Sequence, residues 1–170
     1  SKSKVLALKE LKDDLLYGNG NRKWFIPVAK QVQFSGSTDL PLTPYLLGAL
    51  LGDGGLAHTV ILTNPEDEIV SRCREDLPEG VWIHATGGSA DSIDYRISRV
   101  DKSGPNIVLD ALRYLGLFGL HSPEKFVPEM YKFSTVQDRL DLLHGLMDTD
   151  GTVTKDGIVC AYIHSNAKLG

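Results

Sequence analysis

Two short segments carry the residues that could do chemistry in this chain. Residues 46–54 (LLGALLGDG) and residues 143–151 (LHGLMDTDG) follow one pattern. Each is apolar, has glycine at its third place and a small residue at its seventh, and ends in Asp-Gly. Small residues at these places let two helices approach until their backbones nearly touch. We therefore expect the side chains of Asp53 and Asp150 to meet at the foot of two packed helices.

Paired carboxylates of this kind can hold divalent metal ions for phosphodiester chemistry. A single copy of the motif has a simpler explanation, a buried helix that ends at a glycine and leaves its aspartate in water. Because both copies share all of these positions, a common role is the better interpretation. The sequence predicts helices that begin near Thr43 and Thr135 and pack through four small residues: Gly48, Gly52, Gly145 and Thr149.

Length and composition are those of one ordinary globular domain. The 170 residues are 42% hydrophobic and 24% charged, with a net charge of −4. No apolar run is as long as a membrane span, so we expect no membrane partner and a cytoplasmic protein. Residues 53–120 hold eleven acidic and six basic residues, whereas a chain that neutralises many phosphates usually shows a basic surface. The charge therefore argues against strong DNA binding but leaves local binding open.

Hydrophobic periodicity and turn residues predict an α+β fold in which helices alternate with pairs of strands. A curved antiparallel sheet with one polar face could lie along a DNA groove. Helices are expected at residues 5–17, from 43 into the first motif, at 65–77, 107–117 and 135–148, and strands at residues 24–28, 31–34, 59–63, 81–86, 93–99 and in a hairpin over 153–163.

Further segments resemble the LAGLIDADG homing endonucleases, specifically the endonuclease domain found inside inteins. The resemblance runs from about Trp24 to Gly151. It rests on FIP (25–27), LTPYLLG (42–48), LGL (115–117), SPEKFVP (122–128) and RLDLLHGLMDTDG (139–151). It implies the LAGLIDADG homing-endonuclease fold, an αββαββα unit with the two motif helices side by side and a curved antiparallel sheet.

The resemblance also implies double-strand cleavage of DNA with Mg²⁺ at a long target site. Asp53 and Asp150 would be catalytic and would bind the metal, and the backbone carbonyls of Gly52 and Thr149 would complete the metal shell. The family's catalytic lysine corresponds to Lys125, which could stabilise charge on the scissile phosphate or orient the attacking water. The alternative for Lys125 is a plain surface lysine between helices.

If the chain contacts DNA, the polar strand faces should do so. We expect these contacts from five residues on the strands predicted at 81–86 and 93–99: His84, Thr86, Arg96, Ser98 and Arg99. Arg96 could reach a base edge or a phosphate, and the sequence leaves both open.

The organisation expected from the resemblance has three parts. Residues 1–40 form an N-terminal linker or intein-associated segment, 41–134 the first LAGLIDADG half, and 135–170 the second motif helix with the start of an incomplete second half. The expected partners are double-stranded DNA and an intein splicing domain in the same precursor. The alternative to an active endonuclease is a degenerate insert of an intein that binds DNA or only supports the structure.

Overall fold

The computed structural model describes residues 5–12, 14–25, 29–34, 39–89, 91–101, 104–155, 157, 160–162, 166 and 169. The chain divides into two compact units, Ser1–Val32 and Gln33–Gly170. In the first unit, helix α1 (Leu8–Lys12) is followed by a turn closed by a bridge between Leu16 and Arg22. The Lys23 ammonium donates to the Asp14 carboxylate at 2.7 Å.

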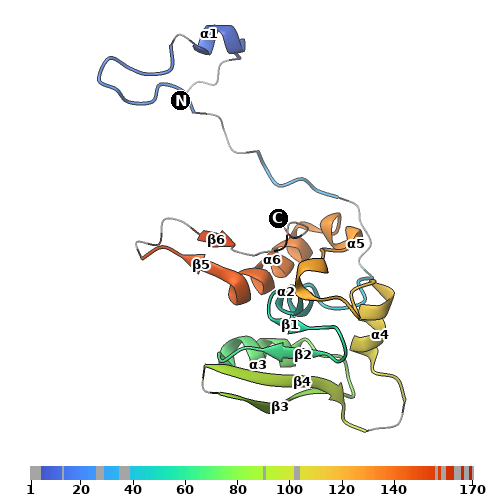
Figure 1. Cartoon of the computed structure of the whole chain (residues 1–170). Helices are drawn as coiled ribbons and strands as arrows, with labels where there is room; N and C mark the ends of the chain where they lie inside the picture. Colours follow the sequence, from blue (N-terminus) through green and yellow to red (C-terminus); the bar gives the residue numbers. More distant parts are fainter. Residues whose placement is uncertain are drawn as a thin grey trace. The chain divides into compact units, whose positions relative to one another are not determined.

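The second unit contains the remaining elements, and it is an α+β arrangement, as the sequence predicts (Figure 1). Its first helices are α2 (Pro44–Gly52), α3 (Asp67–Glu75) and α4 (Ile107–Tyr114). A 3-10 helix (Ser122–Glu124) and α5 (Glu129–Lys132) lead into α6 (Val136–Asp150). The strands are β1 (Gly54–Gly55), β2 (Ile61–Thr63), β3 (Val81–Ser89), β4 (Ser92–Arg99), β5 (Gly151–Val153) and β6 (Cys160–Tyr162).

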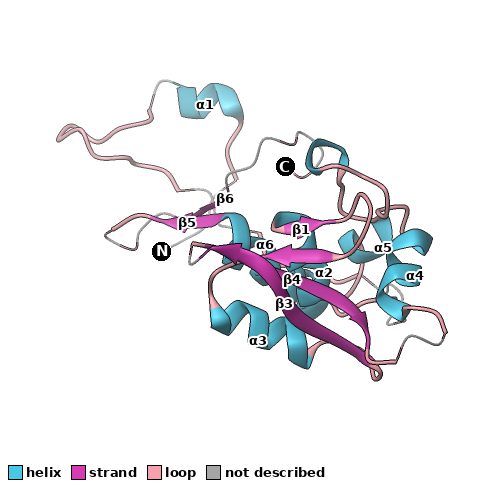
Figure 2. Ribbon diagram, turned by 60° about the horizontal axis from the view of Figure 1, so that its bottom comes forward, coloured by secondary structure: helices cyan, strands magenta, loops and turns pink. Residues whose placement is uncertain are grey.

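Strands β1 to β4 form one antiparallel sheet in the order β1-β2-β4-β3, and β5 pairs with β6 in a separate hairpin (Figure 2). Along β4 the side chains alternate, so that Tyr95 and Ile97 are buried and the residues between them face outward. Leu62 and Ile83 on neighbouring strands point into the same core. The sheet therefore has one apolar face and one polar face, as the alternation predicts.

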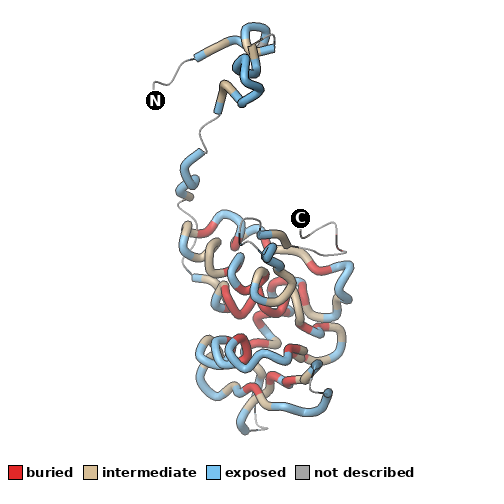
Figure 3. The backbone as a smooth tube through the Cα atoms, turned by 90° about the vertical axis from the view of Figure 1, so that its left-hand side faces the viewer, coloured by how far each residue is buried: buried red, intermediate tan, exposed pale blue. Residues whose placement is uncertain are grey.

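The centre of the second unit is α2, whose residues 45–51 are all buried (Figure 3). A helix that is apolar on every side needs cover on every side. The hydrophobic core joins α2 to the inner face of the sheet, to α4 and to α6. In α6, by contrast, Leu142, Gly145 and Leu146 are the buried residues, and they face α2.

The two motif helices touch through their small residues, which confirms the predicted packing. A Cβ atom added to Gly48 would overlap the carbonyl oxygen of Leu142 and would lie 3.0 Å from the Cα of Gly145. A Cβ atom on Gly145 would overlap the carbonyl oxygen of Tyr45, and one on Gly52 would overlap the side chain of Thr149. The contacts therefore repeat from one motif to the other, as expected for a pseudo-twofold arrangement.

The N-terminal helix is shorter than predicted, and the described residues of the two strands expected there are not in strands. The helix expected over residues 5–17 spans only Leu8–Lys12, because the following residues turn back to form the Leu16–Arg22 bridge. Residues 24–25 and 31–34 are not in strands, and β-rich composition without a paired neighbour does not make a sheet. Residues 26–28, which belong to the FIP motif and the expected first strand, lie outside the described residues.

Elsewhere the predicted elements exist with shifted ends. The strands expected at 81–86 and 93–99 become β3 and β4, and the helices expected at 65–77 and 107–117 are each shorter. The second motif helix runs to Asp150, two residues beyond the expected end. Thr135 begins it with a capping box, accepting from the Asp138 amide, while the Asp138 carboxylate accepts from the Thr135 amide at 3.1 Å.

Replacing Gly48 or Gly145 with alanine should lower the free energy of unfolding by about 1–3 kcal/mol, because the new methyl group would push the two helix backbones apart. Chemical denaturation measures this change. Gly55→Ala is the matched control, since its Cβ would meet nothing nearer than Ile61 at 3.8 Å. Equal stability of Gly48→Ala and Gly55→Ala would contradict the close contact.

Candidate functional site

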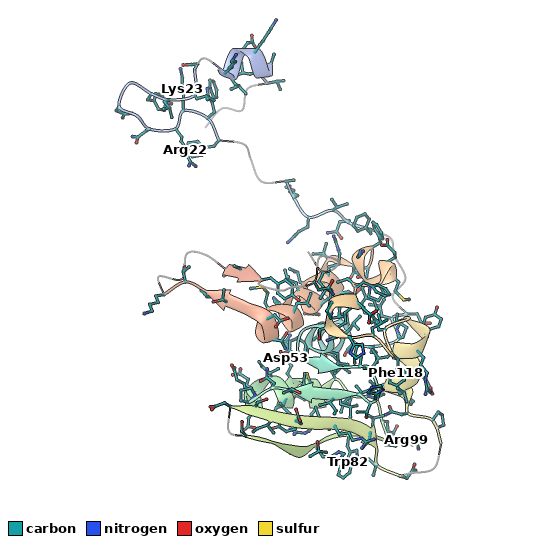
Figure 4. All side chains as sticks on the ribbon, in the orientation of Figure 1. Arg22, Lys23, Asp53, Trp82, Arg99 and Phe118 are labelled. Atoms are coloured by element: carbon teal, nitrogen blue, oxygen red, sulfur yellow. The ribbon has the colours of Figure 1, made fainter. Side chains whose placement is uncertain are left out.

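Asp53 lies directly after the last turn of α2 and is half-buried (Figure 4). Its backbone N–H donates to the carbonyl of Ala49 at 3.0 Å, and its carbonyl accepts from the N–H of Thr63 at 3.1 Å. The side chain is held as well, because the Asn64 amide donates to Asp53 Oδ2 at 2.8 Å. The end of α2 and the end of β2, with Asn64 directly after it, therefore hold the Asp53 carboxylate in place.

Asp150 occupies the corresponding place at the end of α6. The hydroxyl of Tyr162 on β6 donates to Asp150 Oδ2 at 3.5 Å. A Cβ atom on Gly52 would lie 3.4 Å from the same oxygen, so the Asp150 carboxylate reaches across to the end of α2. Burial and, to a lesser extent, the nearby Asp150 together raise the pKa of Tyr162 to about 12, which keeps this phenol protonated as a donor.

The two carboxylates influence one another. Burial raises the pKa of Asp53 above its usual value, and the negative charge of Asp150 raises it as well. The Asn64 hydrogen bond and the positive charge of Lys125 act in the opposite direction. A cation between the carboxylates would remove their repulsion.

Lys125 lies close to the carboxylates of Asp53 and Asp150. The alternative interpretation of Lys125 as a plain surface lysine is wrong. Its side chain is buried, with 1% exposed. The ammonium donates to the carbonyl oxygens of Leu50 and Leu51 at 3.0 Å each, and to that of Gly54 at 2.6 Å. These oxygens belong to the last turn of α2 and the residue after Asp53, where the helix dipole favours a positive charge.

The charge of Lys125 is balanced by the site. Burial lowers the pKa of Lys125 to about 8, while Asp150 and Asp53 act to raise it. The loop that carries the lysine is anchored by Asn166, which is buried and whose amide donates to the carbonyls of Ser122 at 2.9 Å and Lys125 at 2.6 Å. Sequence reasoning missed this role of Asn166, because nothing local in the sequence links it to the lysine loop.

The predicted metal ligands provide oxygen atoms, which are the ligands that Mg²⁺ prefers. Asp53, Asp150 and the end of α2 are brought together. The Gly52 carbonyl also lies 3.4 Å from the Lys125 ammonium, so a metal ion there would share this oxygen with the lysine.

The Thr149 hydroxyl donates to the carbonyls of Gly145 and Leu146 within its own helix. Among the described residues no group of three or more histidine, cysteine or acidic side chains is placed to hold a metal.

The outer face of the sheet holds three of the five residues expected to contact DNA. His84 pairs with Arg96 across β3 and β4, and Trp82 pairs with Ser98. Trp82 was not predicted, yet it is 46% exposed and its ring stacks on His84 with the centroids 4.5 Å apart (Figure 4). The indole N–H donates to the Ser98 hydroxyl at 3.0 Å.

The other two residues lie differently. Thr86 falls in an irregularity of β3 between Ala85 and Gly87, and its hydroxyl donates to the Asp94 carbonyl. Arg99 (Figure 4) donates to the Asp101 carboxylate and to the carbonyl of Pro105, so it links the end of β4 to the residues just before α4. A cavity of about 510 Å³ lies between this loop and the outer strand face.

Sequence reasoning also missed a polar cluster formed by Tyr45, Arg72 and Asp148. The Tyr45 hydroxyl donates to Asp148 Oδ2 at 2.8 Å, and the guanidinium of Arg72 lies 3.6 Å from the Tyr45 ring centroid. This cluster joins α3 to both motif helices. The signal in the sequence is that Asp148 stands where the first motif has the apolar Leu51.

Comparison with known proteins gives partial relatives. No family model matches the chain. It is 32% identical over 126 residues to a replicative DNA helicase DnaB of Mycobacterium intracellulare, a match that covers 71% of this chain and 17% of that protein. It is 34% identical over 123 residues to a replicative DNA helicase DnaB of Nostoc sp., covering 64% of this chain and 13% of that protein. In the part of the chain that the structure describes, no helix has the length and apolar character needed to cross a membrane.

Lys125→Met should lower the free energy of unfolding by about 1–3 kcal/mol, because the carbonyls at the end of α2 would lose their buried donor. Urea denaturation at neutral pH measures the loss. The matched control is Lys132→Met, since Lys132 is exposed and its ammonium lies 3.0 Å from the carboxylate of Glu129 on the same helix. Equal stability of the two variants would contradict the buried role of Lys125.

The raised pKa of Asp53 gives a prediction with a definite sign. An acid with a higher pKa in the folded state makes the folded protein less stable as pH rises through that pKa. Asp53→Asn should therefore stabilise the metal-free protein more at pH 7 than at pH 4. At each pH the stabilisation is the difference in melting temperature between the variant and the wild type. Thermal melts at the two pH values measure this, and an equal effect of Asp53→Asn at both would contradict it.

Proposed function

We propose that this chain is the endonuclease domain of an intein and that it cuts double-stranded DNA in a Mg²⁺-dependent reaction. The observation that carries the proposal is the placement of Asp53 and Asp150 at the ends of two helices in direct backbone contact. The LAGLIDADG resemblance of the motif segments supports the same function. In that setting the fold is the LAGLIDADG fold, and the precursor's splicing domain is a partner.

The matches to replicative helicases support an insertion rather than a motor domain. A helicase motor binds its nucleotide through a phosphate-binding loop of the type GxxxxGK[ST]. The glycine-rich stretch of this chain, residues 52–55 (GDGG), follows a helix and has no such lysine. The chain also matches less than a fifth of either relative's length. We therefore place it in a helicase-like precursor as a segment with its own activity.

Bound between the carboxylates, Mg²⁺ would polarise the scissile phosphate and lower the pKa of an attacking water. The protein's own residues prepare this reaction. Asp53 and Asp150 supply the negative charge that attracts the ion, and the rigid helix ends hold both carboxylates in one orientation. Lys125 contributes a fixed positive charge beneath them, which stabilises charge that develops on the phosphate without moving from its carbonyl partners.

The substrate would lie on the polar face of the sheet. Arg96 and His84 offer donors to phosphates or base edges, and Trp82 offers an exposed ring for apolar contact with bases. Asp94 lies on the same face and holds Thr63 at 2.7 Å, so its charge opposes tight binding. This negative charge favours the second candidate function, an insert that keeps the fold and does not cut.

Cleavage is tested with a supercoiled plasmid that carries the uninterrupted helicase-coding sequence, joined across the position of this segment. Wild-type chain with Mg²⁺ should give linear plasmid, and Asp53→Asn and Asp150→Asn should reduce the rate by at least about 100-fold, as loss of a catalytic metal ligand does. Chelation with EDTA is the control for metal dependence. Binding of the duplex without nicking would identify the non-cleaving insert instead.

DNA contact by the sheet is tested through Trp82, one of two tryptophans in the chain. With Trp24 replaced by phenylalanine, the remaining fluorescence should be quenched by duplex DNA, and the effect should weaken as salt rises because phosphate contacts are electrostatic. Arg96→Ala should lower the affinity, and Arg113→Ala is the control, since Arg113 lies on α4 and pairs with Asp110. Quenching by single strands alone would contradict a duplex-binding face.

A further inference from the structure

Asn64 connects three parts of the second unit through one residue. It is 4% exposed and lies between β2 and α3. Its backbone N–H donates to the carbonyl of Ile93 at 3.0 Å. Its side chain accepts from the N–H of Glu66 at 2.8 Å and donates to Asp53 Oδ2 at 2.8 Å. Nothing in the local sequence links Asn64 to Asp53.

The chemistry of the amide fixes its orientation. The backbone N–H of Glu66 can only donate, so the atom facing it must be the side-chain oxygen of Asn64. The NH₂ group then faces Asp53, where a carboxylate can only accept. Exchanging the two ends of the amide would break both hydrogen bonds. Asn64 therefore holds the Asp53 carboxylate in one rotation.

This hydrogen bond occupies one oxygen of the carboxylate, Oδ2. Within the part of the chain that the structure describes, no side chain donates to Oδ1, which is therefore the oxygen open to a cation. Asp150 is held differently, through the 3.5 Å contact with the Tyr162 hydroxyl. The two carboxylates of the pair are thus not equivalent, and Asp53 is the one with the short, buried partner.

We propose that Asn64 is the positioning residue of the metal site: it orients the Asp53 carboxylate for the cation and ties that orientation to the start of α3. The inference rests on the proposed function, because it requires a metal ion at Asp53 and Asp150. Partners of this kind behind metal ligands typically change metal affinity by about 10–100-fold when they are removed.

Asn106 provides a matched control within the same fold. Its side-chain oxygen accepts from the N–H groups of Val108 and Leu109 at the start of α4, and its amide donates to the Ile97 carbonyl at 3.3 Å. Each asparagine therefore holds the start of a helix with its oxygen and reaches a strand or helix end with its nitrogen. Serine can keep the first contact at either position but lacks the amide donor.

The experiment measures Mn²⁺ binding to the full chain by electron paramagnetic resonance, with thermal melts of every variant. Asn64→Ser should weaken Mn²⁺ binding by about 10-fold or more, and Asn106→Ser should leave it within a factor of two of the wild type. Unchanged affinity in Asn64→Ser, or an equal loss in both variants, would overturn the role of Asn64 while the metal site stands. If the wild type binds no Mn²⁺, or if Asp53→Asn binds it as well as the wild type does, the proposed metal site fails and this inference with it.

A measurement on the wild type covers the case in which Asn64→Ser does not fold. Addition of Mg²⁺ should shift the NMR signals of the Asn64 side-chain amide, because the carboxylate that accepts its hydrogen bond takes up a cation, and should leave the Asn106 amide signals in place. Saturation with Mg²⁺ that leaves the Asn64 amide signals unmoved would overturn the proposal.

Discussion

The close contact between α2 and α6 is the constraint on which the rest of the second unit depends. Two helices approach this closely only where neither has a side chain between them, and Gly48 and Gly145 satisfy that condition for each other. The contact fixes where both helices end, and therefore where Asp53 and Asp150 lie. It also leaves α2 without a solvent-exposed side, which is why the sheet must cover it. Packing and site geometry thus have one physical origin.

Bringing two carboxylates to one place costs stability unless positive charge lies nearby, and Lys125 supplies it from below. A buried ammonium is itself costly, and its cost is offset because the end of α2 presents carbonyl oxygens that have no other helical partner. The ammonium of Lys125 therefore donates hydrogen bonds to the carbonyls at the end of α2, and its positive charge offsets the negative charges of Asp53 and Asp150. This dual role explains why a charged side chain with 1% exposure is compatible with a stable core.

The parts of the structure that the sequence predicted are those determined locally. Glycine spacing predicts the helix contact, and alternation along residues 93–99 predicts which side of β4 is buried. The burial of Lys125 could not be predicted, because its partners lie on α2, far away in the sequence. The same holds for Asn64, whose contact with Asp53 depends on where β2 pairs in the sheet. The described residues of the strands expected at 24–28 and 31–34 are not in strands for a related reason, since residues with β propensity need a neighbouring strand to pair with.

The two motifs have the same backbone arrangement, but the side chains around them differ. The first and last glycines and the final aspartate of the motif repeat. Gly52 is replaced by Thr149, and Leu51 by Asp148, which accepts a hydrogen bond from Tyr45. Asp53 has a short hydrogen bond from a buried amide, and Asp150 has a longer one from Tyr162 on a hairpin strand. The Asp53 carboxylate is therefore held by the shorter of the two hydrogen bonds. A cation that needs both would find Asp53 already oriented, and the adjustment on binding would fall mainly on Asp150.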